Sequence, residues 1–205
     1  LDMAESGILF EDILASTGRV FAGFIIASIL SVPLGITMGC FPSFCALCEP
    51  LIAMLRYMPA AAFTPLLIIY LGIEEAPKIA LIFIGTVYFN VLMVMDSIKF
   101  VPKELIETTL TLGGNTKDLL LKVVARYSLP SIIDTLRINV AVSWNLVIVA
   151  ELIAAEVGLG KRIQLAQRFF RTDQIFAELL VLGLIGFILD MSFRYVLRNT
   201  CKWAV

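Results

Sequence analysis

The sequence predicts an all-α protein, a polytopic transmembrane helix bundle with five visible spans. Of its 205 residues, 60% are hydrophobic and only 16% are charged, and the mean hydropathy is +0.94. Soluble globular domains carry about 25% charged residues. No charged residue occurs in residues 20–48 or in residues 79–95, and about 20 apolar residues are enough for a helix to cross a bilayer. We therefore expect residues 1–205 to form a single membrane-embedded domain.

The charge balance and the absence of one residue type exclude several functions. The formal net charge is −1, so the chain offers no basic excess for binding nucleic acid. It contains no histidine, which excludes bis-histidine haem, histidine-ligated zinc and histidine-based acid–base catalysis. We expect a chain that is not an enzyme and that binds no metal or cofactor of its own.

The first span is expected at residues 20–41. It carries Gly23, Gly35 and Gly39 together with two serines, and small residues let helices approach closely in lipid. In the preceding residues 5–19, apolar side chains fall near one helical face. That segment is either a helix lying in the membrane interface or a simple lead-in turn.

The second span is expected at residues 51–71, where two prolines interrupt the helix. Pro59 and Pro65 each remove a backbone donor, and lipid tolerates the freed carbonyls only where protein or a water-lined cavity satisfies them. This span should therefore face the protein interior. Its candidates for a gate are Tyr57, Pro59, Phe63 and Pro65. The alternative is that they pack as in any kinked span.

The remaining spans are expected at residues 79–95, 131–155 and 175–195. The last two contain charged residues, so their polar faces must point into a bundle, a cavity or an interface. In the fourth span Arg137, Trp144 and Glu151 are seven apart, which places them on one helical face. These three residues and Asn90 of the third span are candidates for lining a translocation pathway. Alternatively, Asp134 and Arg137 form a structural pair and Trp144 packs.

The distribution of Lys and Arg gives a modest bias in orientation. A cytoplasmic C-terminus puts nine of these residues inside, namely Arg56, Lys99, Lys103, Lys117, Lys122, Arg126, Arg194, Arg198 and Lys202. Arg19, Lys78, Lys161, Arg162, Arg168 and Arg171 then face outward. We expect the C-terminus to be cytoplasmic.

A polar stretch at about residues 99–130 separates the third and fourth spans. Gly113 and Gly114 break its apolar pattern, so the stretch should form two short helices joined at a glycine hinge. It is either a plain connector or, because ordered amphipathic loops of this length are uncommon, a docking surface.

This stretch resembles the cytoplasmic loop of permease subunits of ATP-binding-cassette importers. That loop carries Glu-Ala-Ala, then a glycine, and later Leu-Pro. Here Glu107-Thr108-Thr109, Gly113 and Leu129-Pro130 stand at those places, with threonines for both alanines and Tyr127 where isoleucine is usual. The segments "YMPAAAFTPLLIIYLGI", "LRINVAVSWNLVIVAELIAAEVGLG" and "AQRFFRTDQIFAELLVLGLIGFILD" are similar to the nitrate, sulfonate, taurine and bicarbonate branch.

The resemblance implies the type I importer permease fold, with the family's first transmembrane helix missing. It implies a bacterial inner-membrane subunit whose loop couples to ATPases through Glu104, Glu107, Thr108, Thr109, Gly113 and Gly114. The implied partners are a second permease subunit in a homodimer, two cytoplasmic ATPase subunits and an extracytoplasmic substrate-binding protein or domain. The chain has no Gly-rich phosphate loop, so ATP and Mg would be bound by the ATPase subunits. The solute would be a small anion.

Four cysteines suggest an alternative from another class. Cys40, Cys45 and Cys48 have the spacing of plant-type ferredoxins, and Cys201 is a conceivable fourth ligand. A membrane-embedded thiol redox protein would use Cys45 and Cys48. Their apolar surroundings favour free, packed thiols.

Overall fold

The computed structural model describes residues 8–203, and within that range every regular element is helical. The elements are α2 (Ile8–Cys40), α3 (Pro42–Tyr57), the 3₁₀ turn η1 (Ala60–Phe63), α4 (Thr64–Leu71), α5 (Glu75–Ile98), α6 (Lys103–Thr111), α7 (Thr116–Asp118), the π-helical turn η2 (Leu119–Val124), α8 (Ala125–Ala154), α9 (Leu159–Arg168) and α10 (Thr172–Thr200).

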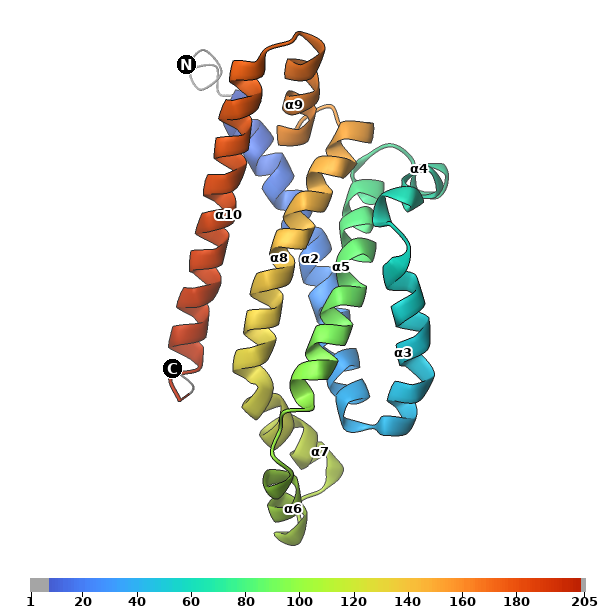
Figure 1. The fold of residues 1–205 in the computed structure, drawn as a ribbon, viewed down its shortest axis with the longest axis vertical. Helices are drawn as coiled ribbons and strands as arrows, with labels where there is room; N and C mark the ends of the chain where they lie inside the picture. Colours follow the sequence, from blue (N-terminus) through green and yellow to red (C-terminus); the bar gives the residue numbers. More distant parts are fainter. Residues whose placement is uncertain (1–7, 204–205) are drawn as a thin grey trace.

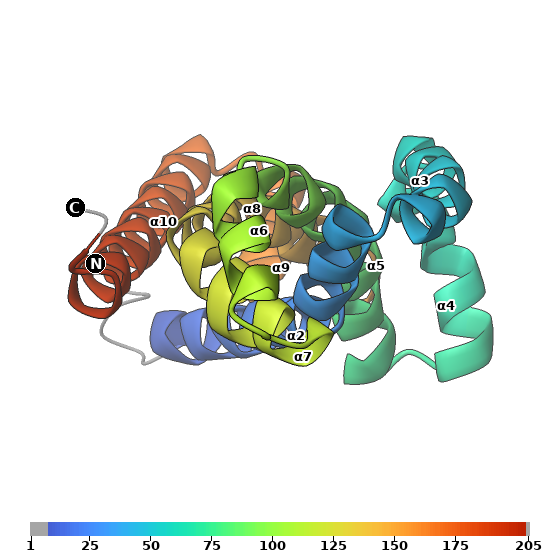
Figure 2. The same ribbon diagram turned by 90° about the horizontal axis from the view of Figure 1, so that it is seen from below.

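Three long helices, α2, α5 and α8, pack side by side as the centre of the bundle (Figure 1). Helix α10 lies along α8, and α3 with α4 forms an arm against α5. Seen from the end where α6 lies, α10 and the arm flank the centre on opposite sides (Figure 2). The main buried cluster joins the central helices to α10 through Phe24, Ile82, Trp144 and Leu189.

The most extensive helix contact, between α2 and α5, is built on the predicted glycines. A Cβ atom added at Gly23 would lie 2.7 Å from Ile82, and one at Gly39 would lie 2.5 Å from Ile98. At Gly35 it would meet Val94 at 2.8 Å. Because no side chain intervenes, the two backbones approach closely along the whole contact. The sequence-based assignment of this helix to a packed span is confirmed.

Helix α2 begins earlier than predicted. Residues 8–19 are neither an interfacial helix nor a turn, because they continue into the first span as one helix of 33 residues; residues 5–7 lie outside the described range. The polar side chains that suggested a boundary, Asp12, Ser16 and Arg19, are all buried. Their partners on other helices, given below, allow the helix to run on without exposing them.

The second span is broken, as its prolines predict, but it starts before residue 51. Helix α3 begins at Pro42 and ends at Tyr57, and the chain then bends by 83° into the segment Ala60–Leu71. Pro59 is the N-cap of η1, and a proline also lies in the first turn of α4, where the missing N–H has no helical partner to lose. Four helices are long and apolar enough to cross a membrane, and the bent pair makes a fifth, which confirms five spans.

The bundle has two polar ends. One end carries α4 and α9, and the other carries α6 and α7 together with the described end of the chain after α10 (Figure 1). The predicted side of Arg56 is wrong, because α3 rises from the α6 end and Arg56 lies in its last turn. There its guanidinium carbon lies 5.5 Å from the ring centroid of Tyr57.

Candidate functional site

Helix α6 projects beyond the end of the bundle (Figure 1). It exposes both charged and apolar side chains. Glu104, Glu107 and Thr108 are exposed, as are Leu110 and Leu112, the last with 82% of its surface accessible. On its other side, Ile106 packs with Leu119 against a small buried cluster at the end of α5. The loop is therefore ordered on the bundle and presents an uncovered outer surface.

Gly113 ends α6 in a Schellman motif. The Gly114 N–H donates to the Thr109 carbonyl at 2.9 Å, and the Gly113 N–H donates to the Leu110 carbonyl at 3.0 Å. Gly113 has φ +83°, and a Cβ added there would meet no atom within 4 Å, so the backbone conformation, and not crowding, requires glycine. The predicted glycine hinge is a helix terminator with a defined geometry.

Two threonines stand where the resembled loop has alanines, and their hydroxyl groups form hydrogen bonds within α6. Thr108 Oγ1 donates to the Glu104 carbonyl at 2.6 Å, and Thr109 Oγ1 donates to the Leu105 carbonyl at 2.7 Å. Such bonds to the carbonyl four residues earlier leave no unpaired donor on the helix surface. The two substitutions therefore keep α6 helical without adding a polar group that needs an external partner.

The second half of the loop is continuous with the fourth span, which is a correction to the predicted boundary. Asn115 Oδ1 accepts the Asp118 N–H at 2.9 Å and caps the start of α7. The chain then runs through η2 directly into α8, with Pro130 inside that helix. A displacement of α6 therefore acts on one continuous helical element.

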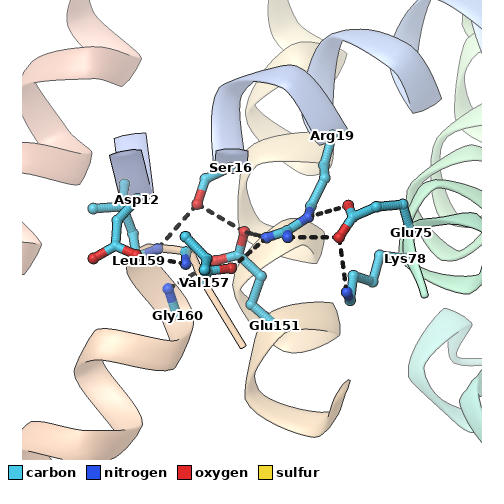
Figure 3. Close-up of polar contacts among 10 residues, drawn as sticks. Asp12, Ser16, Arg19, Glu75, Lys78, Glu151, Val157, Leu159 and Gly160 are labelled. Carbon is cyan, nitrogen blue, oxygen red and sulfur yellow. Dashed lines mark hydrogen bonds and ion pairs between the residues drawn. The ribbon is translucent and has the colours of Figure 1, made fainter. Parts of the chain in front are cut away.

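At the opposite end, a buried network of ion pairs joins four helices (Figure 3). Glu151 of α8 is fully buried and accepts hydrogen bonds from Ser16 Oγ at 2.7 Å, Arg19 Nη1 at 2.7 Å and the Gly160 N–H at 2.8 Å. Arg19 also donates from Nε and Nη2 to Glu75 at 2.5 and 2.8 Å, and Glu75 accepts from Lys78 at 2.9 Å. The network thus ties α2 to α5 and α8.

Asp12 extends the network to α9. It accepts the Gly158 N–H at 2.7 Å and Arg162 Nε at 2.5 Å. Three carboxylates therefore face three cations, and none is left without a partner. The sequence analysis placed Arg19, Lys78 and Arg162 on the outward-facing side of the membrane but named no partners for them. The signal for their pairing is that charges at the ends of apolar segments need partners in lipid.

Arg137, Trp144 and Glu151 share a helical face, but that face packs inside the chain. Arg137 lies 3.3 Å from both Asp134 and Asp190, and Trp144 Nε1 donates to the Leu182 carbonyl of α10 at 3.2 Å. Side chains that line a pathway would point into open space, whereas these contact other residues of the chain. They favour the structural alternative, in which Asp134 and Arg137 pair and Trp144 packs. Asp190 also pairs with Arg194 at 2.8 Å.

Asn90 is also enclosed by the bundle. It is fully buried, and its Oδ1 accepts a hydrogen bond from Asn139 Nδ2 at 2.7 Å across the α5–α8 contact. The neighbouring pair Thr86 and Ser143 is 2.8 Å apart. Hydrogen-bonded polar pairs of this kind hold transmembrane helices together. Asn90 therefore helps to join α5 to α8.

The gate candidates lie apart from these residues, at the break between α3 and α4. Tyr57, Pro59 and Pro65 are exposed and Phe63 is half-buried. A pocket of about 200 Å³ opens at this break and is lined in part by Pro59, Gly85 and Leu146. Of the predicted pathway residues, Tyr57, Pro59 and Pro65 are exposed, Phe63 and Arg137 are partly accessible, and Asn90, Trp144 and Glu151 are buried.

A larger cleft of about 690 Å³ lies beside the ion-pair network, between the arm and the α8–α9 connection. Its charged lining residues are Arg19, Lys78, Glu74, Glu75 and Glu156. Because Arg19 and Lys78 already pair with carboxylates, the cleft offers an anion no unpaired cation among its lining residues.

Within residues 8–203 nothing supports the redox alternative for the cysteines. All four are free thiols, and no group of three metal-ligating side chains occurs in this range. Cys45 and Cys48 pack against a buried cluster that includes Met38 and Ile52. Burial raises the pKa of the Cys201 thiol, which lowers the fraction of reactive thiolate.

Comparisons with known proteins identify relatives across most of the chain. Residues 31–200 match the family described as binding-protein-dependent transport system inner membrane component. The chain is 38% identical over 199 residues to a protein of Methanocaldococcus jannaschii named as an ABC transporter permease, covering 97% of this chain and 74% of that protein. It is 32% identical to the taurine transport system permease protein of Escherichia coli, covering 95% and 71%.

Further comparisons agree in family and in fold. The bicarbonate transport system permease protein of Synechococcus elongatus is 29% identical over 93% of this chain and 70% of its own length. A chain from a structure of the MetNI methionine ABC transporter in inward-facing conformations superposes with a TM-score of 0.86 at 15% identity, covering 94% of this chain and 95% of that chain. That likeness establishes the fold.

Proposed function

Because the chain belongs to the family of binding-protein-dependent transport system inner membrane components, it is a permease subunit of an ABC importer, and we propose that α6 is the element through which it couples to ATPase subunits. The observation that carries this proposal is the exposed surface of α6 around Glu107 and Leu112, held in place by the Gly113 terminator.

The geometry of the loop suits a mechanical role. An exposed leucine at the tip of α6 supplies apolar area for a groove in a partner, and Glu104 and Glu107 supply charge at its rim. Movement of α6 passes to α8 through the continuous helix that starts at Thr116. An ATPase that closes on nucleotide would therefore tilt α8 relative to the rest of the bundle.

The proposed assembly contains two copies of this chain, two cytoplasmic ATPase subunits that hold ATP and Mg, and an extracytoplasmic substrate-binding protein. The last described residues after α10 lie at the α6 end of the bundle (Figure 1), so we place the C-terminus in the cytoplasm. The opposite end, which carries α4, α9 and the ion-pair network, would receive the binding protein. The chain itself would carry out no chemical step.

The proposed solute is a small anion of the sulfonate, nitrate or bicarbonate type, or the amino sulfonate taurine. Support comes from the relatives named for taurine and bicarbonate transport. The gate would be the break between α3 and α4, where Tyr57, Pro59, Phe63 and Pro65 remain accessible. In the proposed assembly, a second copy of the chain would face this 83° bend.

The test is transport by the reconstituted complex with variants of the loop. Glu107→Lys reverses a charge on the exposed face of α6, and Gly113→Val places a β-branched residue at φ +83°. Both changes should abolish stimulation of ATPase activity and uptake of labelled taurine, nitrate or bicarbonate, while membrane insertion persists.

A matched control is Glu11→Lys, which makes the same charge reversal on an exposed residue of α2 at the other end of the bundle. It should leave ATPase stimulation intact. Normal coupling in both loop variants would overturn the proposal. Coupled ATPase activity with no uptake of any of the three solutes would leave coupling in place and overturn the proposed substrate class.

A further inference from the structure

A pocket rich in aromatic and basic side chains lies where the end of α10 meets the start of α8. It has a volume of about 430 Å³ and is lined by Leu105, Lys122, Val123, Arg126, Tyr127 and Trp203. The guanidinium carbon of Arg126 lies 5.8 Å from the ring centroid of Trp203, a distance at which cation and ring attract. None of the lining residues is acidic.

The pocket carries a surplus of positive charge. Lys122 pairs with Asp118 at 2.6 Å, but Arg126 forms no ion pair with another residue of the described range, and neither do the exposed Arg198 and Lys202 nearby in the chain. Two exposed aromatic rings, Tyr127 and Trp203, border these cations. This combination suits an anion that is attached to an apolar body.

The pocket lies at the level of the headgroup layer when the bundle spans a bilayer. Helix α10 has 29 residues, which at 1.5 Å per residue gives about 43 Å, longer than the ~30 Å hydrocarbon core. Its last turn, with Arg198, and the Trp203 that follows therefore lie at the polar boundary. Trp and Tyr are enriched at that level.

The position of Trp203 is fixed by the structure. Cys201 is fully buried, and its N–H donates to the Leu197 carbonyl at 2.9 Å, which holds the chain against the bundle just before the ring. Most of α10 is exposed along its length, including Leu180, Leu184 and Tyr195. Lipid can therefore reach the pocket from the side.

We propose that this pocket binds the headgroup of an anionic phospholipid. Arg126 would bond the phosphate oxygens, and Tyr127 and Trp203 would lie beside the glycerol and the upper acyl chains. Lateral access along α10 favours lipid over a soluble protein as the occupant. The orientation in the proposed function assigns the pocket to the cytoplasmic leaflet, but binding requires only that the bundle spans a bilayer.

The consequence concerns α6, because Leu105 of that helix forms one wall of the pocket. A bound headgroup would contact the loop helix, η2 and the segment after α10 together. Lipid would thereby steady the same element that is proposed to meet the ATPase.

The experiment uses fluorescence quenching by brominated lipids. The chain has two tryptophans, and the Trp203 signal is the difference between the wild type and Trp203→Phe. The protein is reconstituted in phosphatidylcholine bilayers that contain brominated phosphatidylglycerol or, in a second series, brominated phosphatidylcholine. Brominated phosphatidylglycerol should quench Trp203 with about fivefold higher relative affinity, as expected for one cation at a membrane surface.

Variants distinguish lipid binding at the pocket from attraction by the general charge of the protein surface. Arg126→Gln should remove most of the preference for phosphatidylglycerol, and Arg126→Lys should keep it. Arg168→Gln, at an exposed arginine of the opposite end, should leave it unchanged. Circular dichroism of each variant checks that the bundle is folded.

Several outcomes would overturn the proposal. Equal quenching by the two brominated lipids, or an undiminished preference in Arg126→Gln, would exclude a headgroup site at this pocket. Loss of the preference on adding inorganic phosphate, with sodium chloride of matched ionic strength as the control, would indicate a site for small soluble anions. Displacement of the lipid by the purified ATPase subunit would indicate a protein-docking surface. The outcomes measured with lipid and with inorganic phosphate do not depend on whether the chain couples to an ATPase.

Discussion

Arg19 Nη1 donates to Glu151 Oε1 at 2.7 Å, joining two helices through residues that are 132 apart in the sequence. Both side chains are buried, with 7% of Arg19 and none of Glu151 accessible. The pair lies at the opposite end of the bundle from α6 and joins α2 to α8 (Figure 3). It fixes α2 and α8 to each other at this end of the bundle.

Removal of one partner should be costly. Arg19→Met leaves the Glu151 carboxylate buried without its cation, and breaking a buried pair in this way destabilises by about 3–5 kcal/mol. We expect a marked fall in the free energy of unfolding, measured by denaturant titration in detergent micelles. The matched control is Arg194→Met, which breaks the exposed Asp190 pair and should cost at most about 1 kcal/mol. Equal losses in the two variants would contradict the account.

Gly158 should tolerate no side chain. Its φ of +138° lies in a region that only glycine adopts readily, and an added Cβ would lie 2.5 Å from the Glu151 carboxylate. Gly158→Ala should therefore destabilise by about 2 kcal/mol or more. Gly18→Ala is the control, because no atom lies within 4 Å of its Cβ position and helix propensity favours Ala there. Thermal unfolding of both variants measures the difference, and an unaffected Gly158→Ala would refute this explanation.

Replacement of Glu178 should affect stability in the opposite way to replacement of Glu151. It is 1% exposed, and neither carboxylate oxygen has a hydrogen-bond partner within residues 8–203. Glu178→Met should leave stability unchanged or raise it by about 1–3 kcal/mol, because it removes an unsatisfied buried group. Glu151→Met removes a satisfied one and should lower stability. The same denaturant titration compares the two, and a destabilised Glu178→Met would reveal a partner for that carboxylate.

The cysteines should be dispensable. With Cys40, Cys45, Cys48 and Cys201 all replaced by serine, uptake by the reconstituted importer should persist, since none of them ligates a metal or forms a disulfide in the described range. In the unmodified protein Cys201 should react slowly with thiol reagents at neutral pH, because burial raises its pKa. Uptake that is lost in the serine variant, together with a measurable thiol redox activity in the parent, would revive the redox alternative.

Local features of the sequence predicted the architecture well. Uncharged runs located the first and third spans, Pro59 and Pro65 located the break in the second, and Gly113 located the end of the loop helix. Each of these depends on one segment and its own backbone chemistry. The small residues of α2 also predicted a close helix contact, since in lipid they have few other uses.

The partners of the charged residues could not be predicted in the same way. Glu151 and Glu178 are both glutamates at the end of an apolar segment, yet one accepts three hydrogen bonds and the other accepts none within residues 8–203. Two of these three bonds come from Ser16 and Arg19, which are more than a hundred positions away and which only the fold brings near. For the same reason the sequence predicted which residues of α8 share a face, but it did not predict which helix packs against that face.

The central claim is that α6 meets an ATPase subunit, and the accessibility of its tip tests it most directly. In the cysteine-free chain, Leu112→Cys places a thiol at a site that is 82% exposed. Its rate of alkylation by a water-soluble maleimide is measured before and after assembly with the ATPase subunits, with Ile73→Cys at the other end as the control. The account predicts strong protection of Leu112→Cys and none of Ile73→Cys, whereas an unchanged rate at Leu112→Cys in the assembled complex would contradict it.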